Sequence, residues 1–447
     1  MQRILVANRS EIAIRVFRAA AELGIKTVAV FAWEDRFSLH RFKADEAYQI
    51  GQGKGPVAAY LDIQGIVDLA KRVKVDAIHP GYGFLSENAN FARACRDAGI
   101  TFIGPPPEVL ELFGDKVAAR KLAIEAGLPV LPGTDGPVKP GPSLKKEAKR
   151  IGFPLIMKAS FGGGGRGMRV VHKAEELEGF LEEARREAGA AFGNDAVFLE
   201  RYIPRAKHIE VQVLGDAHGE IVHLWERDCS VQRRHQKLIE ESPSPALDEE
   251  LRRKMGSCAV QLAREAGYQN AGTVEFLVDR DRNFYFMEMN TRIQVEHPVT
   301  EMVTGLDLVK LQLRIASGEK LPFKQEDVKL RGAAIEVRIN AEDPDNDFKP
   351  SPGKIERYFG PGGIGVRLDS HAYAGYSVPP NYDSMIGKLI CRGETRDEAL
   401  LVMKRALDEF VIEGVKTTIP LHKKIVSHVQ FQRGNVDTSF IAEYFPH

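Results

Sequence analysis

The sequence has few cysteines, no net charge and no long apolar run. Its four cysteines, among 447 residues, form no C-x-x-C pair, which argues against a disulfide framework or zinc site and favours a reducing cytoplasm. Lys and Arg number 62, as do Asp and Glu, so the chain has no overall field to attract nucleic acid or an anionic membrane. No apolar stretch approaches the roughly 20 residues that span a bilayer, and the N-terminus lacks the longer apolar stretch of a signal peptide. These absences predict a soluble, cytoplasmic globular protein that binds neither nucleic acid nor membrane.

The N-terminal part of the chain also lacks a glycine-rich turn after its first strand. Short apolar strands and amphipathic helices alternate here, with strands at 3–8, 26–31 and 77–79 and helices at 10–23, 61–72 and 88–98. This alternation predicts a parallel, doubly wound sheet. The first strand-to-helix turn reads ANRSE at 7–11, without the glycines that let backbone approach a pyrophosphate. A nicotinamide-dependent oxidoreductase is therefore disfavoured.

The rest of the chain divides into segments with different patterns. Proline and glycine cluster at 132–143, which predicts a loop or linker. Residues 144–204 have the pattern helix, strand, glycine loop, strand, helix and strand. From 208 to 290 the pattern changes to antiparallel hairpins, with turns at 215–219 and 279–283. We therefore predict an α+β protein built from three sub-domains.

A glycine loop joins two strands of the second segment. A buried strand ends at Lys158, and four glycines at 162–165 and Arg166 precede the next strand at 168–171. A P-loop would read GxxxxGK[ST] and run into a helix, and neither condition is met. Two strands joined by glycines are instead typical of a flap over phosphates, with backbone N–H groups and both cations as ligands. An ordinary flexible hairpin loop is the alternative.

Two strand-like runs flank a short polar turn that follows Leu277. A turn centred between residues 281 and 282 places Glu275 opposite Glu288 and Leu277 opposite Phe286, with Asn290 on the face of Glu288. Opposed like charges destabilise a sheet pair, so a shared proton, a cation or solvent must offset them. A hard divalent ion that also takes phosphate oxygens suits these ligands. The flap favours Mg²⁺, and a proton-sharing acid/base pair is the alternative.

Two charged segments complete the candidate site. In TRIQVEHP at 291–298, Arg292 could bind a small oxyanion bidentately and Glu296 could act as a base. Taken alone, this segment would be an ordinary charged loop. The segment ERDCSVQRRHQK at 226–237 is a dense cation cluster after a predicted hairpin strand. Such a run is usually solvated, but its interleaved Gln and His favour a pocket for a nucleotide and an anion.

With these residues in place, the chain resembles the biotin carboxylases nearly end to end. The motifs that carry the resemblance are HPGYGFLSEN at 79–88, KASFGGGGRGMRVV at 158–171, ERDCSVQRRHQK at 226–237 and MEMNTRIQVEHPVTEMVTG at 287–305. The resemblance implies the α+β ATP-grasp fold, with an N-terminal doubly wound parallel-sheet domain, a mobile lid and a mostly antiparallel C-terminal domain. The implied boundaries are 1–115 for the N-terminal domain, 116–204 for linker and lid, 205–330 for the catalytic core and 331–447 for the C-terminal domain.

The resemblance also implies residue roles. The implied ATP contacts are Lys116, Lys158, Gly163, Gly164, Gly165, Met168, Glu200, Ile203, His208, Gln232, His235, Leu277 and Glu288. The implied ligands of Mg²⁺ or Mn²⁺ are Glu275, Glu288 and Asn290, in agreement with the hairpin argument. The implied bicarbonate pocket consists of Lys237, Arg292, Gln294, Val295 and Glu296. Tyr82 and Arg338 would contact biotin.

The implied mechanism has two stages. Glu296 deprotonates bicarbonate, held by Lys237 and Arg292, and the bicarbonate attacks the γ-phosphate of MgATP to give carboxyphosphate. Carboxyphosphate breaks down to CO₂ and phosphate, and the phosphate removes the ureido proton of biotin. Arg338 stabilises the resulting enolate-like oxyanion by preorganised charge. Water must be excluded, which gives a closing lid its purpose.

The resemblance also leads to expectations about partners. The chain has no Met-Lys-Met biotinylation turn, so we expect a separate biotin carboxyl carrier protein and the carboxyltransferase subunits of a parent complex, unless the chain is a fragment of a longer enzyme. The first half-reaction of acetyl-CoA carboxylase, in fatty-acid synthesis, is the favoured assignment. A pyruvate or other acyl-CoA carboxylase, another ATP-grasp ligase and a nucleotide sensor are the alternatives. A homodimer is expected through Arg15, Arg18, Glu22 and Arg367.

At two positions the chain departs from the usual family glycine. Ser10 stands at the first and is expected to cap the following helix. Phe161 stands at the second and is expected to stiffen the flap.

Overall fold

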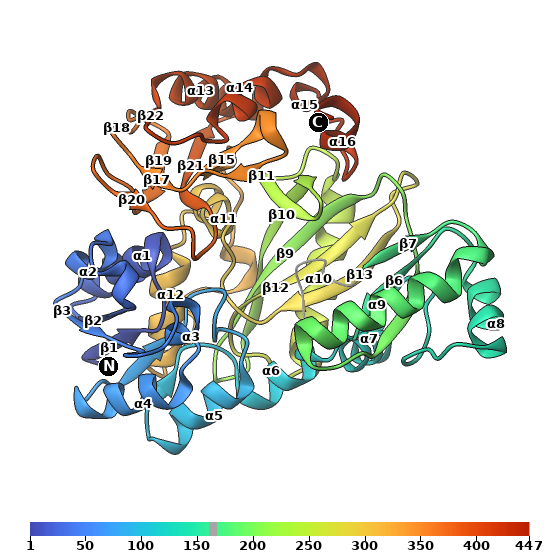
Figure 1. Ribbon diagram of the computed structural model, residues 1–447, viewed down its shortest axis with the longest axis horizontal. Coiled ribbons are helices and arrows are strands. Elements are labelled where there is room, and N and C mark those ends of the chain that lie inside the picture. Colours follow the sequence, from blue (N-terminus) through green and yellow to red (C-terminus); the bar gives the residue numbers. More distant parts are fainter. Residues whose placement is uncertain (161–167, 447) are drawn as a thin grey trace.

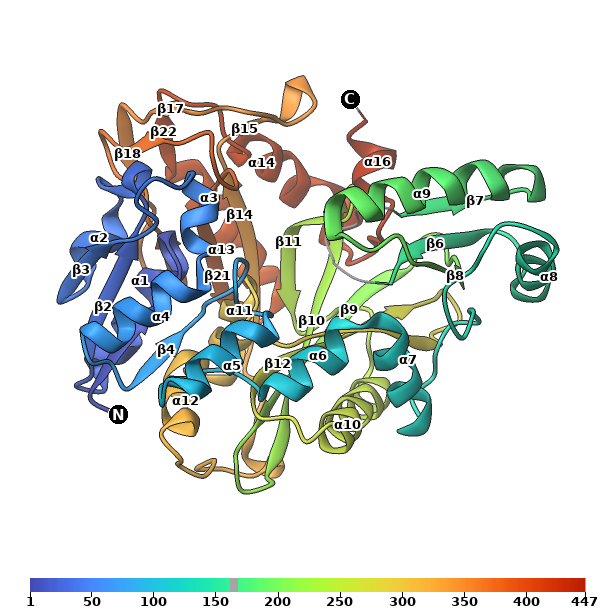
Figure 2. The same ribbon diagram turned by 60° about the horizontal axis from the view of Figure 1, so that its bottom comes forward.

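The computed structural model describes residues 1–160 and 168–446. The flap positions Phe161, Gly163, Gly164, Gly165 and Arg166 lie outside the described residues. Figures 1 and 2 show the N-terminal domain in blue at one end, the lid in green at the other, and a large sheet between them. The C-terminal helices, in red, lie together at the top of Figure 1 and pack on a face of this sheet.

The N-terminal domain is built on a parallel sheet of order β3-β2-β1-β4-β5. Its strands are β1 (Arg3–Val6), β2 (Lys26–Phe31), β3 (Glu46–Gln49), β4 (Ala77–His79) and β5 (Thr101–Phe102). Leu5 faces a core completed by α4 (Ile63–Arg72) and α5 (Ala89–Asp97). Ile4 and Val6 face the other core, with α1 (Ser10–Glu22) and α12 (Leu308–Ala316). Because both faces of the central strand β1 are covered, its residues 4–6 are continuously apolar, and the predicted doubly wound sheet is confirmed.

The start of α1 corrects one expectation. Ser10 has φ +60°, in the left-handed region, and is the first residue of α1, so that Arg9 occupies the N-cap position. The Ser10 hydroxyl oxygen is buried and has no hydrogen-bond partner among the described residues. The expected capping role of Ser10 is therefore wrong. The left-handed backbone explains why glycine suits this position better than an L-residue.

The lid is a separate antiparallel sheet of order β7-β6-β8. Its elements are α8 (Pro142–Ile151), β6 (Leu155–Ala159), β7 (Arg169–Val171), α9 (Leu177–Phe192) and β8 (Val197–Arg201). The chain reaches it through α6 (Pro107–Gly114) and α7 (Lys116–Glu125). Leu144, Leu155, Leu181 and Leu199 form a core of its own. The predicted order of helix, strand, strand, helix and strand is confirmed, while the glycine loop predicted between the first two strands lies outside the described residues.

The central sheet is antiparallel, with the order β13-β12-β9-β10-β11-β14-β21-β19. Its strands are β9 (Lys207–Gly215), β10 (Ile221–Arg233), β11 (Gln236–Ser242), β12 (Asn270–Val278), β13 (Phe284–Asn290), β14 (Ala333–Asn340), β19 (Val366–Ser370) and β21 (Met385–Gly393). The pairing of β11 with β14 makes the sheet continuous across residue 330. The helix α10 (Glu249–Glu265) covers one face, where Ile209, Val211 and Phe276 form a core.

Two of the remaining helices, at 39–43 and 56–60, belong to the N-terminal domain, and the other elements complete the structure. The helices are α2 (Leu39–Lys43), α3 (Pro56–Tyr60), α11 (His297–Thr304), α13 (Arg396–Glu409), α14 (Ile419–Ser427), α15 (Val429–Gln432) and α16 (Phe440–Tyr444). The short strand pairs are β15 (Glu342–Asp343) with β16 (Lys349–Pro350), β17 (Gly353–Lys354) with β20 (Ser377–Val378), and β18 (Arg357–Phe359) with β22 (Val411–Glu413). Within residues 1–160 and 168–446, no helix combines the length and apolarity needed to cross a membrane.

The β12–β13 hairpin confirms one predicted pair and corrects another. Glu275 lies directly opposite Glu288, as expected. Leu277 lies opposite Tyr285, so the expected pairing of Leu277 with Phe286 is wrong. The register shifts between Glu275 and the next residue because the β13 side has one extra residue, a β-bulge.

Candidate active site

The candidate site lies on the face of the central sheet that α10 does not cover. Along β9, His208 and Glu210 alternate with Ile209 and Val211, and the two apolar side chains belong to the core beneath α10. Because strand side chains alternate between faces, His208 and Glu210 share the opposite face. Charged side chains of β10, β11, β12 and β14 join them there through the contacts described below.

Lys237 of β11 is at the centre of this polar face. Its ammonium Nζ donates to Glu210 Oε2 at 2.5 Å, to Glu296 Oε1 at 2.6 Å and to Glu275 Oε1 at 3.0 Å. Burial opposes the charge of Lys237, but the three carboxylates outweigh it and hold its pKa well above the usual range. The sequence-predicted bicarbonate and metal residues therefore meet at one ammonium group.

Glu296 is the carboxylate expected to act as the base. It lies between Lys237 and Arg338, whose Nη2 donates to Glu296 Oε2 at 2.9 Å. Burial alone would raise the pKa of Glu296, but the ion pairs with Lys237 and Arg338 hold it well below its usual range. Glu296 is therefore ionised at neutral pH and can accept a proton.

The carboxylate hairpin provides donors for a divalent ion. Glu275 Oε1 accepts hydrogen bonds from Asn290 Nδ2 and Gln294 Nε2, both at 2.9 Å. Glu288 forms an ion pair with Lys116 at 3.1 Å. Carboxylate and amide oxygens are the ligands of a hard divalent cation, so the expected ligands fit Mg²⁺.

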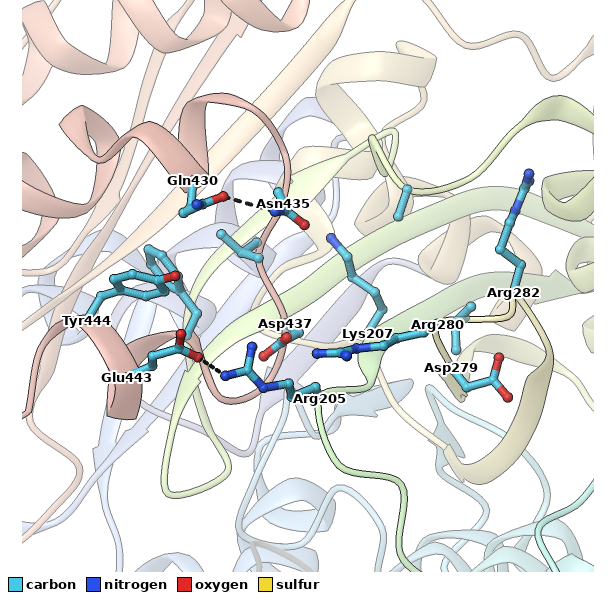
Figure 3. A pocket seen from close by; sticks show the side chains of 14 residues that line it. Arg205, Lys207, Asp279, Arg280, Arg282, Gln430, Asn435, Asp437, Glu443 and Tyr444 are labelled. Carbon is cyan, nitrogen blue, oxygen red and sulfur yellow. Dashed lines mark hydrogen bonds and ion pairs between the residues drawn. The ribbon is translucent and has the colours of Figure 1, made fainter.

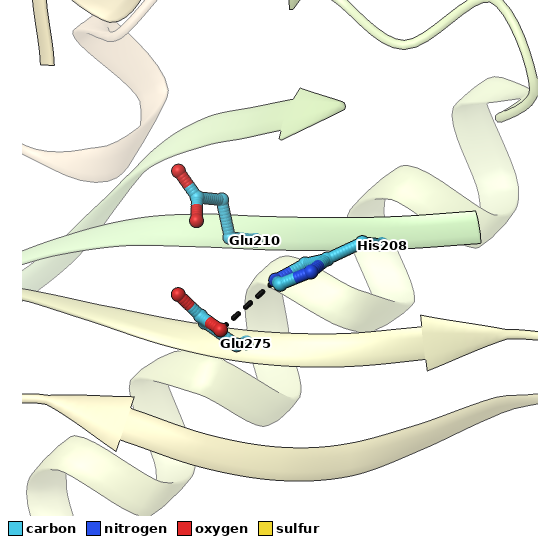
Figure 4. A group of neighbouring side chains, drawn as sticks. All are labelled: His208, Glu210 and Glu275. Atoms are coloured by element: carbon cyan, nitrogen blue, oxygen red, sulfur yellow. Dashed lines mark hydrogen bonds and ion pairs between the residues drawn. The ribbon is translucent and has the colours of Figure 1, made fainter. Parts of the chain in front are cut away.

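A histidine and a second carboxylate lie beside Glu275. Figure 4 shows His208, Glu210 and Glu275 gathered on neighbouring strands, with His208 Nε2 at 2.9 Å from Glu275 Oε2. Burial raises the pKa of Glu275, but Lys237 and His208 outweigh it and hold that pKa well below the usual range. The charges of Glu210 and Glu275 are therefore offset by the ammonium group of Lys237 from β11.

Sequence reasoning missed Glu210 and Arg227, which organise the site from within the sheet. Arg227 has no exposed side-chain surface and lies inside β10, not in a loop after a strand. Its guanidinium donates to Glu210 at 2.5 Å and to Gln294 at 2.7 Å, and so joins the site to the predicted bicarbonate residues. Further acceptors are Gln212, Thr300 and Thr273. The sequence signal that could have identified Arg227 was its position within a strand-like run of residues.

Glu87 was also missed, although it lies in the HPGYGFLSEN motif. Its carboxylate accepts from Arg292 Nε at 2.9 Å and from the backbone N–H of Thr291 at 3.1 Å. Arg292 Nη2 also donates to Asn290 Oδ1 at 3.3 Å. Burial opposes the charge of Arg292, but Glu87 outweighs it and raises the pKa of that guanidinium. The N-terminal domain therefore fixes the arginine expected to bind bicarbonate.

The predicted nucleotide residues come from the lid and from the adjoining strands. Lys158 and Glu200 form a buried ion pair across β6 and β8. Gln232 Nε2 lies 3.4 Å from His208 Nδ1. His235 is exposed on a two-residue turn whose residues, with φ 48° and 67°, adopt the positive φ values of a type I′ hairpin. Half-buried apolar side chains complete this group, at Met168, Ile203 and Leu277.

The predicted biotin residues come from different parts of the chain, Arg338 from β14 and Tyr82 from the loop after β4. Arg338 of β14 donates to Glu240 at 2.6 Å as well as to Glu296. Tyr82 donates its hydroxyl to Glu11 Oε1. Burial and Glu11 raise the pKa of Tyr82, and Arg338 partly opposes this.

A cavity of about 430 Å³ lies away from this site (Figure 3). Lys207 and Val278 line this cavity. Lys207 comes directly before His208 in β9, and Val278 comes directly after Leu277 in β12. Strand alternation therefore places the cavity toward the α10 face. Its cations are partly paired, since Arg205 contacts Glu443 and Lys207 donates to the Gly434 carbonyl at 3.0 Å.

The parallel-sheet domain, the lid sheet and the carboxylate hairpin together define an ATP-grasp protein, in the class of ATP-dependent ligases. Family models described as "Biotin carboxylase, N-terminal domain", "Carbamoyl-phosphate synthase L chain, ATP binding domain" and "Biotin carboxylase C-terminal domain" match residues 1–110, 115–324 and 336–443. "Biotin carboxylase 1" of Bacillus subtilis (strain 168) is 54% identical over 445 residues, covering 99% of each chain. The chain belongs to the biotin carboxylase family.

Relatives from other carboxylases are equally similar. A pyruvate carboxylase subunit of Methanothermobacter thermautotrophicus is 54% identical, covering 99% of this chain and 90% of that protein. A solved structure of the biotin carboxylase domain dimer of Hydrogenobacter thermophilus 2-oxoglutarate carboxylase, in complex with MgADP, ADP and bicarbonate, has a TM-score of 0.97 at 51% identity. It covers 99% of this chain and 97% of that one.

These findings confirm the expected family, fold and class of enzyme. The chain is an ATP-dependent ligase of biotin carboxylation, and the expectation of ATP, Mg²⁺ and biotin is confirmed with it.

Proposed function

We propose that this chain catalyses the first half-reaction of an acetyl-CoA carboxylase, on biotin attached to a separate carrier protein. The similarity to "Biotin carboxylase 1" over 99% of each chain supports the biotin carboxylation step of this proposal. A component of a pyruvate or another carboxylase is the second candidate, which the equally similar pyruvate carboxylase subunit favours. Carboxyltransferase subunits are the proposed further partners in either case.

The observation that carries the proposed chemistry is the position of Glu296 between Lys237 and Arg338. Bicarbonate held by Lys237 and Arg292 gives its proton to the ionised Glu296. The freed oxygen attacks the γ-phosphorus of ATP, and the bond to the leaving ADP oxygen breaks with its electron pair. Gln294 and the Val295 backbone complete the proposed bicarbonate pocket. The carboxyphosphate that forms breaks down to CO₂ and phosphate, and the phosphate takes the ureido N–H proton of biotin. Arg338 stabilises the resulting oxyanion until the deprotonated nitrogen attacks CO₂ to form carboxybiotin.

Other residues position the nucleotide. Glu275, Glu288 and Asn290 would hold Mg²⁺, which supplies positive charge at the phosphate oxygens of ATP when bound. Lys116 and Lys158 would contact the phosphates. In this structure Lys116 pairs with Glu288 of the hairpin, and Lys158 pairs with Glu200 of the lid. The proposed wall around adenine and ribose consists of Met168, Glu200, Ile203, His208, Gln232, His235 and Leu277.

We retain the division at residues 115, 204 and 330 as a proposal, with 116–204 acting as linker and lid. The separate core of the lid supports its movement as a unit. We also propose a homodimer, as the relative from Hydrogenobacter thermophilus forms. Two of the cations proposed for that interface, Arg15 of α1 and Arg367 of β19, make contacts within the chain, since both pair with Glu301.

Phosphate release tests the first step. The purified chain is given ATP, Mg²⁺, bicarbonate and free biotin, each omitted in turn, beside Glu296→Gln and the exposed control Glu265→Gln. We expect release that needs bicarbonate and rises with biotin, and a loss of about 100-fold or more in Glu296→Gln, the usual contribution of a general base. Release that is independent of bicarbonate would overturn the proposed chemistry.

A labelling experiment tests the proposed acceptor. The tagged chain is isolated from its own cells with bound subunits and given [¹⁴C]bicarbonate, ATP, Mg²⁺ and one acceptor at a time. Label in a product of acetyl-CoA supports the first candidate. Label that appears only with pyruvate or 2-oxoglutarate supports the second and rejects the first.

A further inference from the structure

A buried ion pair lies beside the proposed biotin and bicarbonate residues. Lys388 Nζ of β21 is 3.3 Å from Glu11 Oε1 of α1. The side chain of Lys388 is fully buried, and that of Glu11 is 1% exposed. Removing two such charges from water costs several kcal/mol per ion, and apolar residues of similar volume often do as well or better. Packing alone therefore does not explain why this ion pair is buried here.

Glu11 fixes the side chain of Tyr82. The Tyr82 hydroxyl donates to the same Oε1 atom that faces Lys388. The backbone of this loop is fixed from the same end of α1, because Asn8 Nδ2 donates to the carbonyls of Pro80 and Tyr82, both at 2.8 Å. Glu11 lies in the first turn of α1, where the helix dipole favours a carboxylate. The start of α1 thus orients both the ring and the backbone of Tyr82.

Lys388 fixes the bicarbonate segment. Its ammonium donates to the carbonyl oxygen of Val295 at 2.7 Å. Val295 lies between Gln294 and Glu296, so this bond fixes the backbone that carries both. Lys388 is also the direct cross-strand partner of Arg338 and shares its face of the sheet. One ammonium group therefore connects the bicarbonate segment to Glu11.

We propose that Glu11 and Lys388 are positioning residues for biotin carboxylation, which hold Tyr82 and the Val295 backbone in one rigid frame. Neither contacts a substrate. Glu11 acts through Tyr82 on biotin, and Lys388 acts through Val295 on bicarbonate and through Glu11 on biotin. The inference rests on the proposed function, since it uses the proposed roles of Tyr82 and of residues 294–296.

The frame is tested with Glu11→Gln, Lys388→Met and the double variant. Glu265→Gln and Lys71→Met, at exposed helix positions, are the charge-matched controls. KM for free biotin, bicarbonate and ATP is measured by phosphate release, and thermal unfolding is followed for every variant. We expect Glu11→Gln to raise KM for biotin about tenfold, the effect of one lost hydrogen bond to a charged group, with KM for ATP unchanged within about twofold. Lys388→Met should raise KM for bicarbonate as well.

The double variant separates positioning from charge balance. It removes both buried charges, so its unfolding temperature should return toward that of the wild type, while KM for biotin stays raised about fivefold or more. A double variant with the wild-type KM for biotin would overturn the proposal. So would single variants that raise KM for ATP as much as KM for biotin.

Amide hydrogen exchange keeps the test independent of activity. We expect faster exchange at residues 80–88 and 293–296 in Glu11→Gln and Lys388→Met than in the controls, because these backbones lose their anchors. Unchanged exchange in both segments would refute the frame. Wild-type phosphate release that did not need bicarbonate would instead reject the proposed function, and the exchange result would still decide whether the frame exists.

Discussion

The substitution Arg227→Met should be among the most damaging in the central sheet. The guanidinium is fully buried and donates to Glu210, Gln212, Thr273, Thr300 and Gln294. Methionine preserves much of the volume but removes the charge and every donor. Glu210 would then keep Lys237 as its ion-pair partner.

The expected loss of stability depends on which charges stay paired in the Arg227→Met variant. Removing one partner of a buried ion pair usually costs about 3–5 kcal/mol, because the other charge stays buried. Since Lys237 still neutralises Glu210, we expect the lower end, about 3 kcal/mol. Globular proteins have roughly 5–15 kcal/mol of stability, so the variant should fold with a much reduced margin. KM for bicarbonate should rise about tenfold, because Gln294 loses a charged hydrogen-bond partner.

Urea denaturation provides the comparison. The matched control is Arg253→Met, whose arginine pairs with Glu249 but is 69% exposed, so we expect a loss within about 0.5 kcal/mol. Arg227→Lys keeps the charge without the planar set of donors and should lie between the two. The reasoning is refuted if Arg227→Met loses no more stability than Arg253→Met.

Three further changes test separate features. Burial raises the pKa of Glu240 from its ordinary 4.5 to about 7, so the folded chain holds this proton more tightly than the unfolded chain. Urea titrations should therefore show that the stability of the wild type, measured relative to that of Glu240→Gln, decreases as the pH rises from 4.5 to about 7. A relative stability that increases over this range would contradict the reasoning. Ser10→Gly should stabilise the chain by about 0.5–1 kcal/mol through relief of the left-handed backbone, and a loss in thermal unfolding would argue against that strain. Glu288→Gln should raise the Mg²⁺ concentration for half-maximal ATP turnover about tenfold, with no such shift in Glu265→Gln; equal shifts would reject Glu288 as a ligand.

Local patterns predicted much of the fold and the centre of the site. Alternating strands and helices predicted the parallel sheet, and the short turn after β12 was sufficient to pair Glu275 with Glu288. The pairing of Leu277 failed because an extra residue in β13 shifts the register, and period-two patterning contains no signal for a bulge. The role of Ser10 failed for a similar reason, since its backbone conformation, not its side-chain type, determines whether it can cap.

The missed residues were charges whose partners lie far away in the sequence. The alternation of His208 and Glu210 with Ile209 and Val211 is the pattern of a strand with one solvated face. Here the polar face meets Lys237, Arg227 and other charges. The contact of Glu87 with Arg292 spans 205 residues of sequence, so no local window contains it. Because each buried charge is costly alone, the fold is stable only when these partners arrive together. The same alternation therefore fits a solvated edge or a catalytic face, and the tertiary arrangement of the other strands decides between them.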